Sequence, residues 1–181
     1  MILFFGPAGS GKSAQAQLVV DNEGWKWLSM GQLLRDTSDS EVHEYQKKGL
    51  LVPIEKVNQV LGEALDKFTA SDEMILDGYP RQMDQAVWLI DNCKSRGLSI
   101  ELAINFDVNM EELLKRMELR GRDDDTPESI NKRLEIYHKE IDPILNFLSK
   151  NDTKVVYVDG VGLLENIHTR VMKELVECKL A

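Results

Sequence analysis

The sequence has few cysteines and no long apolar run. Its two cysteines, Cys93 and Cys178, lie far apart and form no C-x-x-C pair, so we expect neither a disulfide framework nor a cysteine-based zinc site. The longest apolar run is far too short to cross a bilayer, and the first residues form no basic and apolar leader. We therefore expect no membrane contact and a cytoplasmic location.

Basic residues are also scarce, since 22 Lys and Arg stand against 31 Asp and Glu and the formal net charge is −9. Such a surface repels nucleic acids and anionic membranes, so neither is an expected partner, and any phosphate site must be a local cluster of cations. The 181 residues, 43% of them hydrophobic, can bury one ordinary core. Proline and glycine are too few to mark a linker, so we expect one domain over residues 1–181. We also expect a monomer.

A phosphate-binding loop pattern lies near the start of the chain. Residues 6–13 read Gly-Pro-Ala-Gly-Ser-Gly-Lys-Ser, which matches G-x-x-x-x-G-K-[ST], between an apolar run and a helix-compatible segment. Glycines let backbone N–H groups turn toward phosphate oxygens, and Lys12 adds a full charge for the β- and γ-phosphates. The hydroxyl of Ser13 is a candidate ligand of Mg²⁺. A glycine-rich turn that fits the pattern by chance is the alternative.

Apolar runs alternate with longer amphipathic segments, which is typical of strand–helix–strand units and a parallel sheet. Five strands are predicted: Ile2–Phe5, Trp25–Leu28, Met74–Leu76, Leu102–Phe106 and Val155–Val158. Two intervals, about 30–70 and about 116–133, are longer than a simple crossover. We expect them to be insertions over the carboxyl edge of the sheet, where an open α/β sheet binds its ligands.

An acidic residue, Asp77, ends the third predicted strand and is followed by Gly78, Pro80 and Arg81. A carboxylate at this end of a strand beside a phosphate-binding loop is placed to hold Mg²⁺, directly or through water. Arg81 and Gln85 are four residues apart on the helix that follows, so they can address one bound molecule. The alternative for Asp77 is an ordinary helix cap or turn residue.

The second insertion gathers four arginines, Arg116, Arg120, Arg122 and Arg133. In so acidic a chain this cluster indicates a polyanionic ligand, and we assign the three aspartates at 123–125 to orienting the guanidinium groups. A surface network of ion pairs is the alternative. An arginine such as Arg35 in the first insertion, taken alone, is most often a solvated surface charge.

Together these segments resemble the adenylate kinase family of nucleoside monophosphate kinases, in its short-lid form. The matching blocks, in order, are GPAGSGKSAQ, LSMGQLLRD, GLLVP, ILDGYPRQMDQA, INFDV, LLKRMELRGRDDD, INKRLEIYHKE and YVDGVG. The resemblance implies an α/β P-loop NTPase fold with a five-stranded parallel sheet in the order 2-3-1-4-5, helices on both faces, a monophosphate-binding insertion and a short lid. It also implies transfer of the γ-phosphoryl group of ATP to AMP with Mg²⁺, giving two ADP. The lid is too short for the four-cysteine zinc site of longer lids, so no zinc is expected.

The resemblance also implies roles for individual residues. Those expected to contact ATP are Gly9, Ser10, Gly11, Lys12, Ser13, Ala14, Arg116, Arg120, Gly160 and Val161. Those expected to contact AMP are Met30, Arg35, Leu50, Leu51, Val52, Gly78, Arg81, Gln85, Arg122 and Arg133. Ser13 and Asp77 would hold Mg²⁺, Asp77 through water. Phosphoryl transfer depends on alignment and charge compensation, here expected from Lys12, Arg81, Arg116, Arg120, Arg122 and Arg133.

Several positions depart from the family pattern. The loop reads Gly11-Lys12-Ser13-Ala14 where the family usually reads Gly-Lys-Gly-Thr. Met30 stands where AMP-selective members tend to place threonine, and Gln32 replaces the usual acid.

The identity of the acceptor therefore depends on Gln85. Its amide can pair with the donor and acceptor on the edge of adenine, so we expect AMP. Met30 is flexible enough to accept another base, which leaves a UMP/CMP-type or other monophosphate kinase as the alternative. Two further alternatives are a nucleotide-binding module without turnover and a shikimate-like kinase of a non-nucleotide metabolite.

Overall fold

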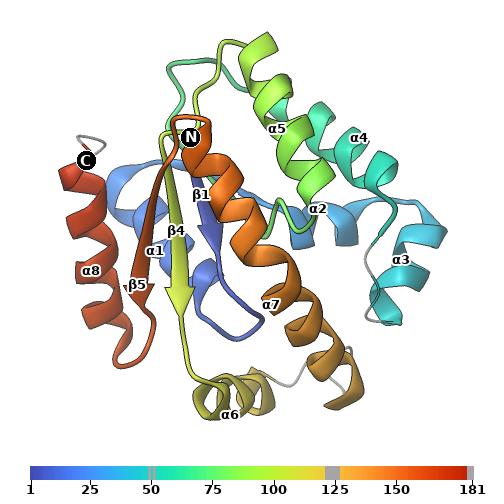
Figure 1. The fold of residues 1–181 in the computed structure, drawn as a ribbon, viewed down its shortest axis with the longest axis vertical. Helices are drawn as coiled ribbons and strands as arrows, with labels where there is room; N and C mark the ends of the chain where they lie inside the picture. The colour runs from blue at the N-terminus through green and yellow to red at the C-terminus, as the bar shows by residue number, and fades with distance from the viewer. Residues whose placement is uncertain (49, 51, 121–126, 179–181) are drawn as a thin grey trace.

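A five-stranded parallel sheet in the order β2-β3-β1-β4-β5 forms the centre of the computed structural model (Figure 1). The structure describes residues 1–48, 50, 52–120 and 127–178, and for residues 120, 127–129 and 133 it describes the backbone alone. The strands are β1 (Ile2–Phe5), β2 (Lys26–Ser29), β3 (Met74–Asp77), β4 (Leu102–Asp107) and β5 (Lys154–Asp159). The predicted fold class and strand order are confirmed, with strand ends shifted by one residue in most cases.

Helices fill the intervals between the strands. They are α1 (Lys12–Glu23), α2 (Met30–Asp36), α3 (Ser40–Lys47), α4 (Ile54–Leu65), α5 (Met83–Ser95), α6 (Met110–Arg120), α7 (Pro127–Lys150) and α8 (Leu164–Glu177). The first predicted insertion corresponds to α2, α3 and α4, while residues 121–126 of the predicted lid lie outside the described residues. Within the described parts of the chain, no helix is both long and apolar enough to cross a membrane.

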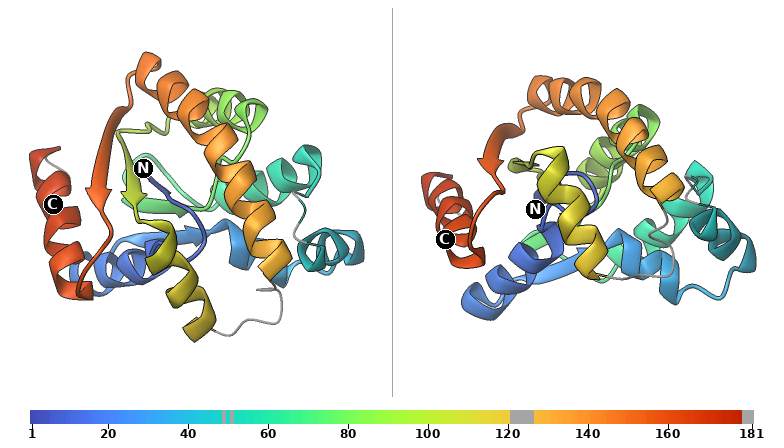
Figure 2. Two further views of the ribbon diagram at one scale, coloured as in Figure 1. Left: turned by 60° about the horizontal axis from the view of Figure 1, so that its bottom comes forward. Right: turned by 90° about the horizontal axis from the view of Figure 1, so that it is seen from below.

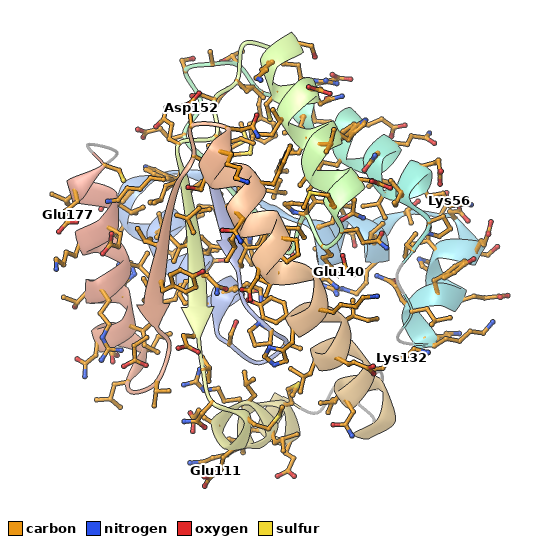
Figure 3. All side chains as sticks on the ribbon, viewed as in Figure 1. Lys56, Glu111, Lys132, Glu140, Asp152 and Glu177 are labelled. Atoms are coloured by element: carbon orange, nitrogen blue, oxygen red, sulfur yellow. The ribbon has the colours of Figure 1, made fainter. Side chains whose placement is uncertain are left out.

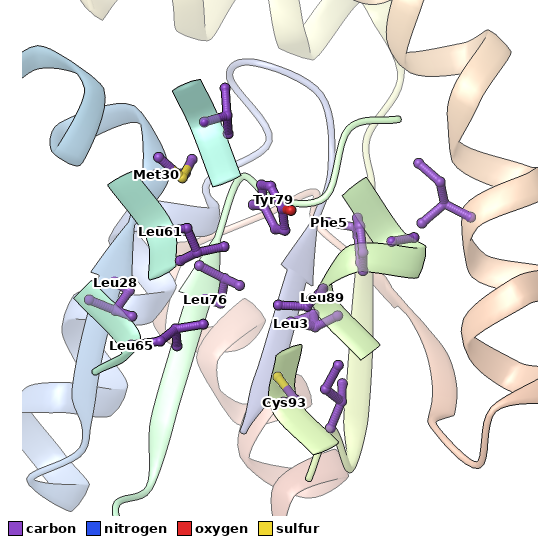
Figure 4. Packing of buried hydrophobic residues seen from close by; sticks show 14 of the residues in the cluster. Leu3, Phe5, Leu28, Met30, Leu61, Leu65, Leu76, Tyr79, Leu89 and Cys93 are labelled. Atoms are coloured by element: carbon purple, nitrogen blue, oxygen red, sulfur yellow. The ribbon is translucent and has the colours of Figure 1, made fainter. Parts of the chain in front are cut away.

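Strand β1 is buried on both faces, which explains its continuous apolar sequence. Successive side chains of a strand point to opposite faces, so Ile2 and Phe4 pack with residues of α1 and α8, whereas Leu3 and Phe5 pack with residues of α4, α5 and α7. Figure 4 shows Leu3 and Phe5 within this second, larger cluster. The two helical layers therefore fix β1, and with it the start of the loop that follows.

The carboxyl ends of the parallel strands meet at one edge of the sheet. At that edge Asp77, the last residue of β3, is in register with Phe4 of β1 and Ser29 of β2. Helix α6 lies across the same end of the sheet (Figure 2). It packs against α7 through a third apolar cluster that includes Leu113, Met117 and Leu134. The fold thus surrounds the carboxyl edge with helices on more than one side.

Candidate active site

The phosphate-binding loop connects β1 to α1, and its glycines adopt backbone angles that other residues rarely reach. Gly9 has φ of 84° and Gly11 has φ of 93°, both in the left-handed region. A Cβ atom on Gly9 would also lie 3.1 Å from the carbonyl oxygen of Leu113 on α6. The glycine spacing in the sequence therefore reflects both the turn and the close approach of α6.

Lys12 holds its ammonium group within the curve of the loop. Its Nζ atom donates hydrogen bonds to the carbonyl oxygens of Gly6 at 2.6 Å and Pro7 at 2.9 Å, and to Ser10 Oγ at 3.2 Å. A cation and the N-terminus of α1 thus face the same concave loop, an arrangement that favours phosphate groups.

Ser13 and Asp77, the two residues predicted to hold a metal, lie together. The Ser13 hydroxyl donates a 2.7 Å hydrogen bond to Asp77 Oδ2, and Asp77 is only 4% exposed. Among the described residues, no group of three or more His, Cys, Asp or Glu side chains gathers into a metal site. Mg²⁺ prefers oxygen ligands and usually keeps several waters and substrate phosphates, so one hydroxyl and one carboxylate fit this ion.

A cavity of about 450 Å³ opens in front of the loop, within the usual range for small-molecule sites. It is lined by many of the residues that the sequence predicted: Gly9, Gly11, Lys12, Ser13, Ala14, Met30, Arg35, Leu50, Val52, Asp77, Gly78, Arg81, Gln85 and Arg116. Three predicted residues are described but are not among its lining residues, namely Ser10, which is fully buried, Gly160 and Val161. The fold therefore brings the loop of β1, the exit of β3 and helix α2 around one space.

Arg81 and Gln85 are joined by a hydrogen bond and both line the cavity, but Arg81 precedes α5 and does not lie on it as predicted. The backbone N–H of Arg81 donates to Gln85 Oε1 at 2.7 Å, and Arg81 Nε donates to the carbonyl oxygen of Gly78 at 2.9 Å. Gln85 is 3% exposed. Its oxygen therefore holds the chain at Arg81, while its NH₂ group is the end that can donate to a ligand.

Arg35 contacts Gln32, one of the residues that depart from the family pattern. Arg35 Nη2 donates to Gln32 Oε1 at 2.8 Å, and Gln32 Nε2 donates to Asp36 Oδ1 at 2.7 Å. The neutral amide therefore links the arginine to an acid one turn away and helps to orient it.

Arg116 also lines the cavity and lies next to the phosphate-binding loop. Its Nη2 atom donates to the carbonyl oxygen of Gly160 at 2.9 Å, so the structure brings together two residues that the sequence analysis assigned to ATP. A Cβ atom on Gly160 would lie 2.6 Å from Val108 Cγ2 and 3.4 Å from the carbonyl oxygen of Ser10. Gly160 is thus packed tightly behind the loop.

Four predicted contacts fall on parts of the chain for which no side chain is described. Leu51 and Arg122 lie outside the described residues, as do the side chains of Arg120 and Arg133. Their assigned roles stay predictions.

Helix α7 supplies a wall of the cavity that the sequence analysis missed. Its lining residues are Ile136, Tyr137, Glu140, Ile141 and Ile144. Tyr137 donates its hydroxyl hydrogen to Asn105 Oδ1, and burial raises the pKa of Tyr137, which keeps the hydroxyl protonated. Tyr137, Ile141 and Ile144 are spaced so that they share one face of the helix, and this pattern could have predicted a buried apolar face. The pattern does not indicate that this face lines a ligand cavity.

Comparisons with known proteins agree with this geometry. A family model described as adenylate kinase matches residues 4–153. An adenylate kinase of Mycolicibacterium vanbaalenii is 38% identical over 180 residues, covering 96% of this chain and 98% of the relative. An adenylate kinase of Mycobacterium ulcerans is 36% identical with the same coverage, and one of Parabacteroides distasonis is 34% identical over 94% of each chain.

Proposed function

Because the chain belongs to the adenylate kinase family, we propose that it binds ATP at the phosphate-binding loop and AMP in the rest of the cavity. The reaction moves the γ-phosphoryl group of ATP to AMP and yields two ADP. The chain is accordingly a phosphotransferase of the nucleoside monophosphate kinase type.

One observation carries the assignment of the two substrates. A single cavity is lined both by Lys12 and Ser13 of the loop and by Arg35, Arg81 and Gln85 from other segments. Cations from the loop and from two other segments suit two phosphate chains laid end to end, with the transferred group between them.

Charge compensation and alignment supply the catalysis. Ser13 and Asp77 would hold Mg²⁺, which neutralises phosphate charge when it is bound. Lys12 holds the donor phosphates, and Arg35 and Arg81 orient the acceptor phosphate for in-line attack. Arg120, Arg122 and Arg133 are proposed to surround the transferred group. The insertion at about 30–70 and the lid at about 116–133 are proposed to close over both nucleotides, which excludes water from the transferred group.

Gln85 favours AMP as the acceptor. Its carboxamide oxygen accepts from the Arg81 N–H, which aims the side chain, and keeps a second lone pair for the 6-amino group of adenine, while the NH₂ group can donate to a neighbouring ring nitrogen. A buried polar group of this kind rejects a base that leaves it unpaired.

The direct test is ADP formation from ATP with AMP, CMP, UMP or GMP. We expect AMP to have the highest kcat/KM, and Lys12→Ala to lower the rate by about 10³-fold because a charge on the transferred phosphates is lost. A tenfold preference for CMP or UMP would contradict the assigned acceptor.

A second measurement separates the kinase from a binding module. An analogue that joins ATP and AMP through their phosphates should stabilise the protein against heat more than ATP alone does, because it fills both subsites. Tight ATP binding with no extra stabilisation and no ADP formation would favour the module.

A further inference from the structure

The guanidinium group of Arg116 is held along one edge by two acceptors from different segments. Its Nε atom donates to Glu112 Oε1 at 2.7 Å, and its Nη2 atom donates to the carbonyl oxygen of Gly160 at 2.9 Å. Nε and Nη2 share an edge of the planar guanidinium group, so the two contacts together fix both its position and its plane.

The held edge turns the rest of the group toward the loop. Arg116 Nη1 lies 3.8 Å from the place that a Cβ atom on Gly11 would occupy. No residue in the described parts of the chain is hydrogen-bonded to Nη1. The group thus presents one N–H₂ end and its flat faces to a nucleotide on the loop.

We propose that Glu112 is a positioning residue for ATP, which acts by holding Arg116 in this orientation. The inference rests on the proposed function, because it takes ATP as the ligand of the loop. The Arg116 side chain is 21% exposed and that of Glu112 is 27% exposed, so water screens their attraction less than it would at the surface.

The place of Glu112 on α6 makes the contact favourable. Glu112 precedes Arg116 by four residues, the order in which an acid and a base on a helix stabilise each other best, and it lies in the first turn, where the helix dipole favours an acid. The second acceptor of Arg116, the carbonyl oxygen of Gly160, is held in place because Gly160 packs against Val108 and the loop. Arg116 is therefore ordered before ATP arrives, which reduces the entropy lost on binding.

Kinetics of Glu112→Leu and Glu112→Gln test the proposal. For Glu112→Leu we expect the KM for ATP and the Kd of ATP measured by calorimetry to rise about five- to tenfold, with the KM for AMP changed less than about twofold. For Glu112→Gln we expect a smaller rise, because the amide oxygen still accepts from Arg116 Nε.

Two comparisons separate positioning from a general effect on the helix. Glu111 is the neighbouring acid in the same first turn, and Figure 3 shows it at the outer margin of α6, so Glu111→Leu should leave the KM for ATP unchanged. In an Arg116→Ala background, Glu112→Leu should have no further effect on the KM for ATP.

Two results would overturn the proposal: an unchanged KM for ATP in Glu112→Leu, or an equal rise in the Arg116→Ala background. If the wild-type protein binds ATP but forms no ADP, the proposed function fails on its own, and the Kd of ATP still tests the role of Glu112.

Discussion

The hydroxyl of Ser13 donates a 2.7 Å hydrogen bond to the carboxylate of Asp77, across 64 residues of sequence. The bond joins the first turn of α1 to the last residue of β3, and both residues line the cavity. The register of β3 beside β1 accounts for it, because parallel neighbours end at the same edge.

We predict that Asp77→Asn raises the Mg²⁺ concentration needed for half-maximal ADP formation by about 10- to 100-fold. The amide keeps the shape of the side chain and still accepts a hydrogen bond from Ser13, but it lacks the charge that favours a divalent cation. The measurement is the initial rate at fixed ATP and AMP over a series of Mg²⁺ concentrations. The thermal midpoint should change little.

Asp91 provides the control for that experiment. It lies exposed on α5, so Asp91→Asn makes the same chemical change away from the cavity and should leave the Mg²⁺ dependence unchanged. If Asp77→Asn behaves like Asp91→Asn, the pair with Ser13 does not hold the ion.

Local sequence encodes much of this arrangement. The loop motif is recognisable because Gly9 and Gly11 need left-handed backbone angles, and β1 is recognisable because it is buried on both faces. The place of Asp77 follows once β1 and β3 are known to be parallel neighbours.

The contribution of α7 could not be predicted in the same way. Tyr137 and Glu140 line the cavity because α7 packs back across the sheet, and tertiary packing decides that path. The contacts of Gln32 and Glu112 were missed for a related reason: a side chain that orients an arginine has no motif of its own.

We predict that Gln85→Glu lowers kcat/KM for AMP by about 10- to 100-fold and leaves the fold intact. A carboxylate oxygen can still accept the hydrogen bond from the Arg81 N–H, now 2.7 Å from Gln85 Oε1, but the variant has no NH₂ group to donate to a base. The measurements are kcat/KM for AMP and the thermal midpoint.

The variant Gln85→Leu separates the two roles of the amide. It removes the acceptor for the Arg81 N–H as well as the donor, so the thermal midpoint should fall together with kcat/KM. Unchanged AMP kinetics in Gln85→Glu would show that Gln85 serves the backbone at Arg81 alone.

We predict that Gly160→Ala destabilises the protein by about 1–3 kcal/mol and also weakens ATP binding. The added methyl group would lie 2.6 Å from Val108 Cγ2 and 3.3 Å from the carbonyl oxygen of Asp107, so the chain must shift. That shift would move the carbonyl oxygen that accepts from Arg116. Denaturant unfolding and ATP calorimetry measure the two effects.

Gly62 offers a matched glycine for comparison. It lies within α4, and a Cβ atom there would meet its nearest neighbour, Trp88, at an ordinary 3.8 Å. Gly62→Ala should therefore leave ATP binding unchanged and stabilise the protein by about 0.5–1 kcal/mol, because alanine is the better helix former. Equal losses of stability in the two variants would refute the steric argument at Gly160.

A polar cluster between α1 and α8 favours neutral His168. Gln15 Nε2 donates to the carbonyl oxygen of Leu164 at 3.0 Å, which leaves Gln15 Oε1 to accept from His168 Nδ1 at 3.2 Å. His168 Nε2 lies 2.9 Å from Asn22 Nδ2, a donor, and so serves as the acceptor of that pair. Protonation of His168 would place a hydrogen on Nε2, so that two donors, Nε2 of His168 and Nδ2 of Asn22, would face each other.

We predict that the protein loses part of its free energy of unfolding as the pH falls from about 7.5 to 5, and that His168→Gln loses less over the same range. Burial lowers the pKa of His168 below its ordinary value of 6.5, against a smaller opposing effect of Glu23. As the pH falls, the unfolded chain therefore binds the proton at a higher pH than the folded protein does. Neutral His168 contributes fully to the free energy of unfolding above pH 6.5, and this contribution declines as the pH falls through the folded-state pKa of His168. Urea unfolding at a series of pH values measures both proteins. Parallel curves for wild type and variant would mean that His168 titrates alike in the folded and unfolded states, which the cluster with Gln15 and Asn22 argues against.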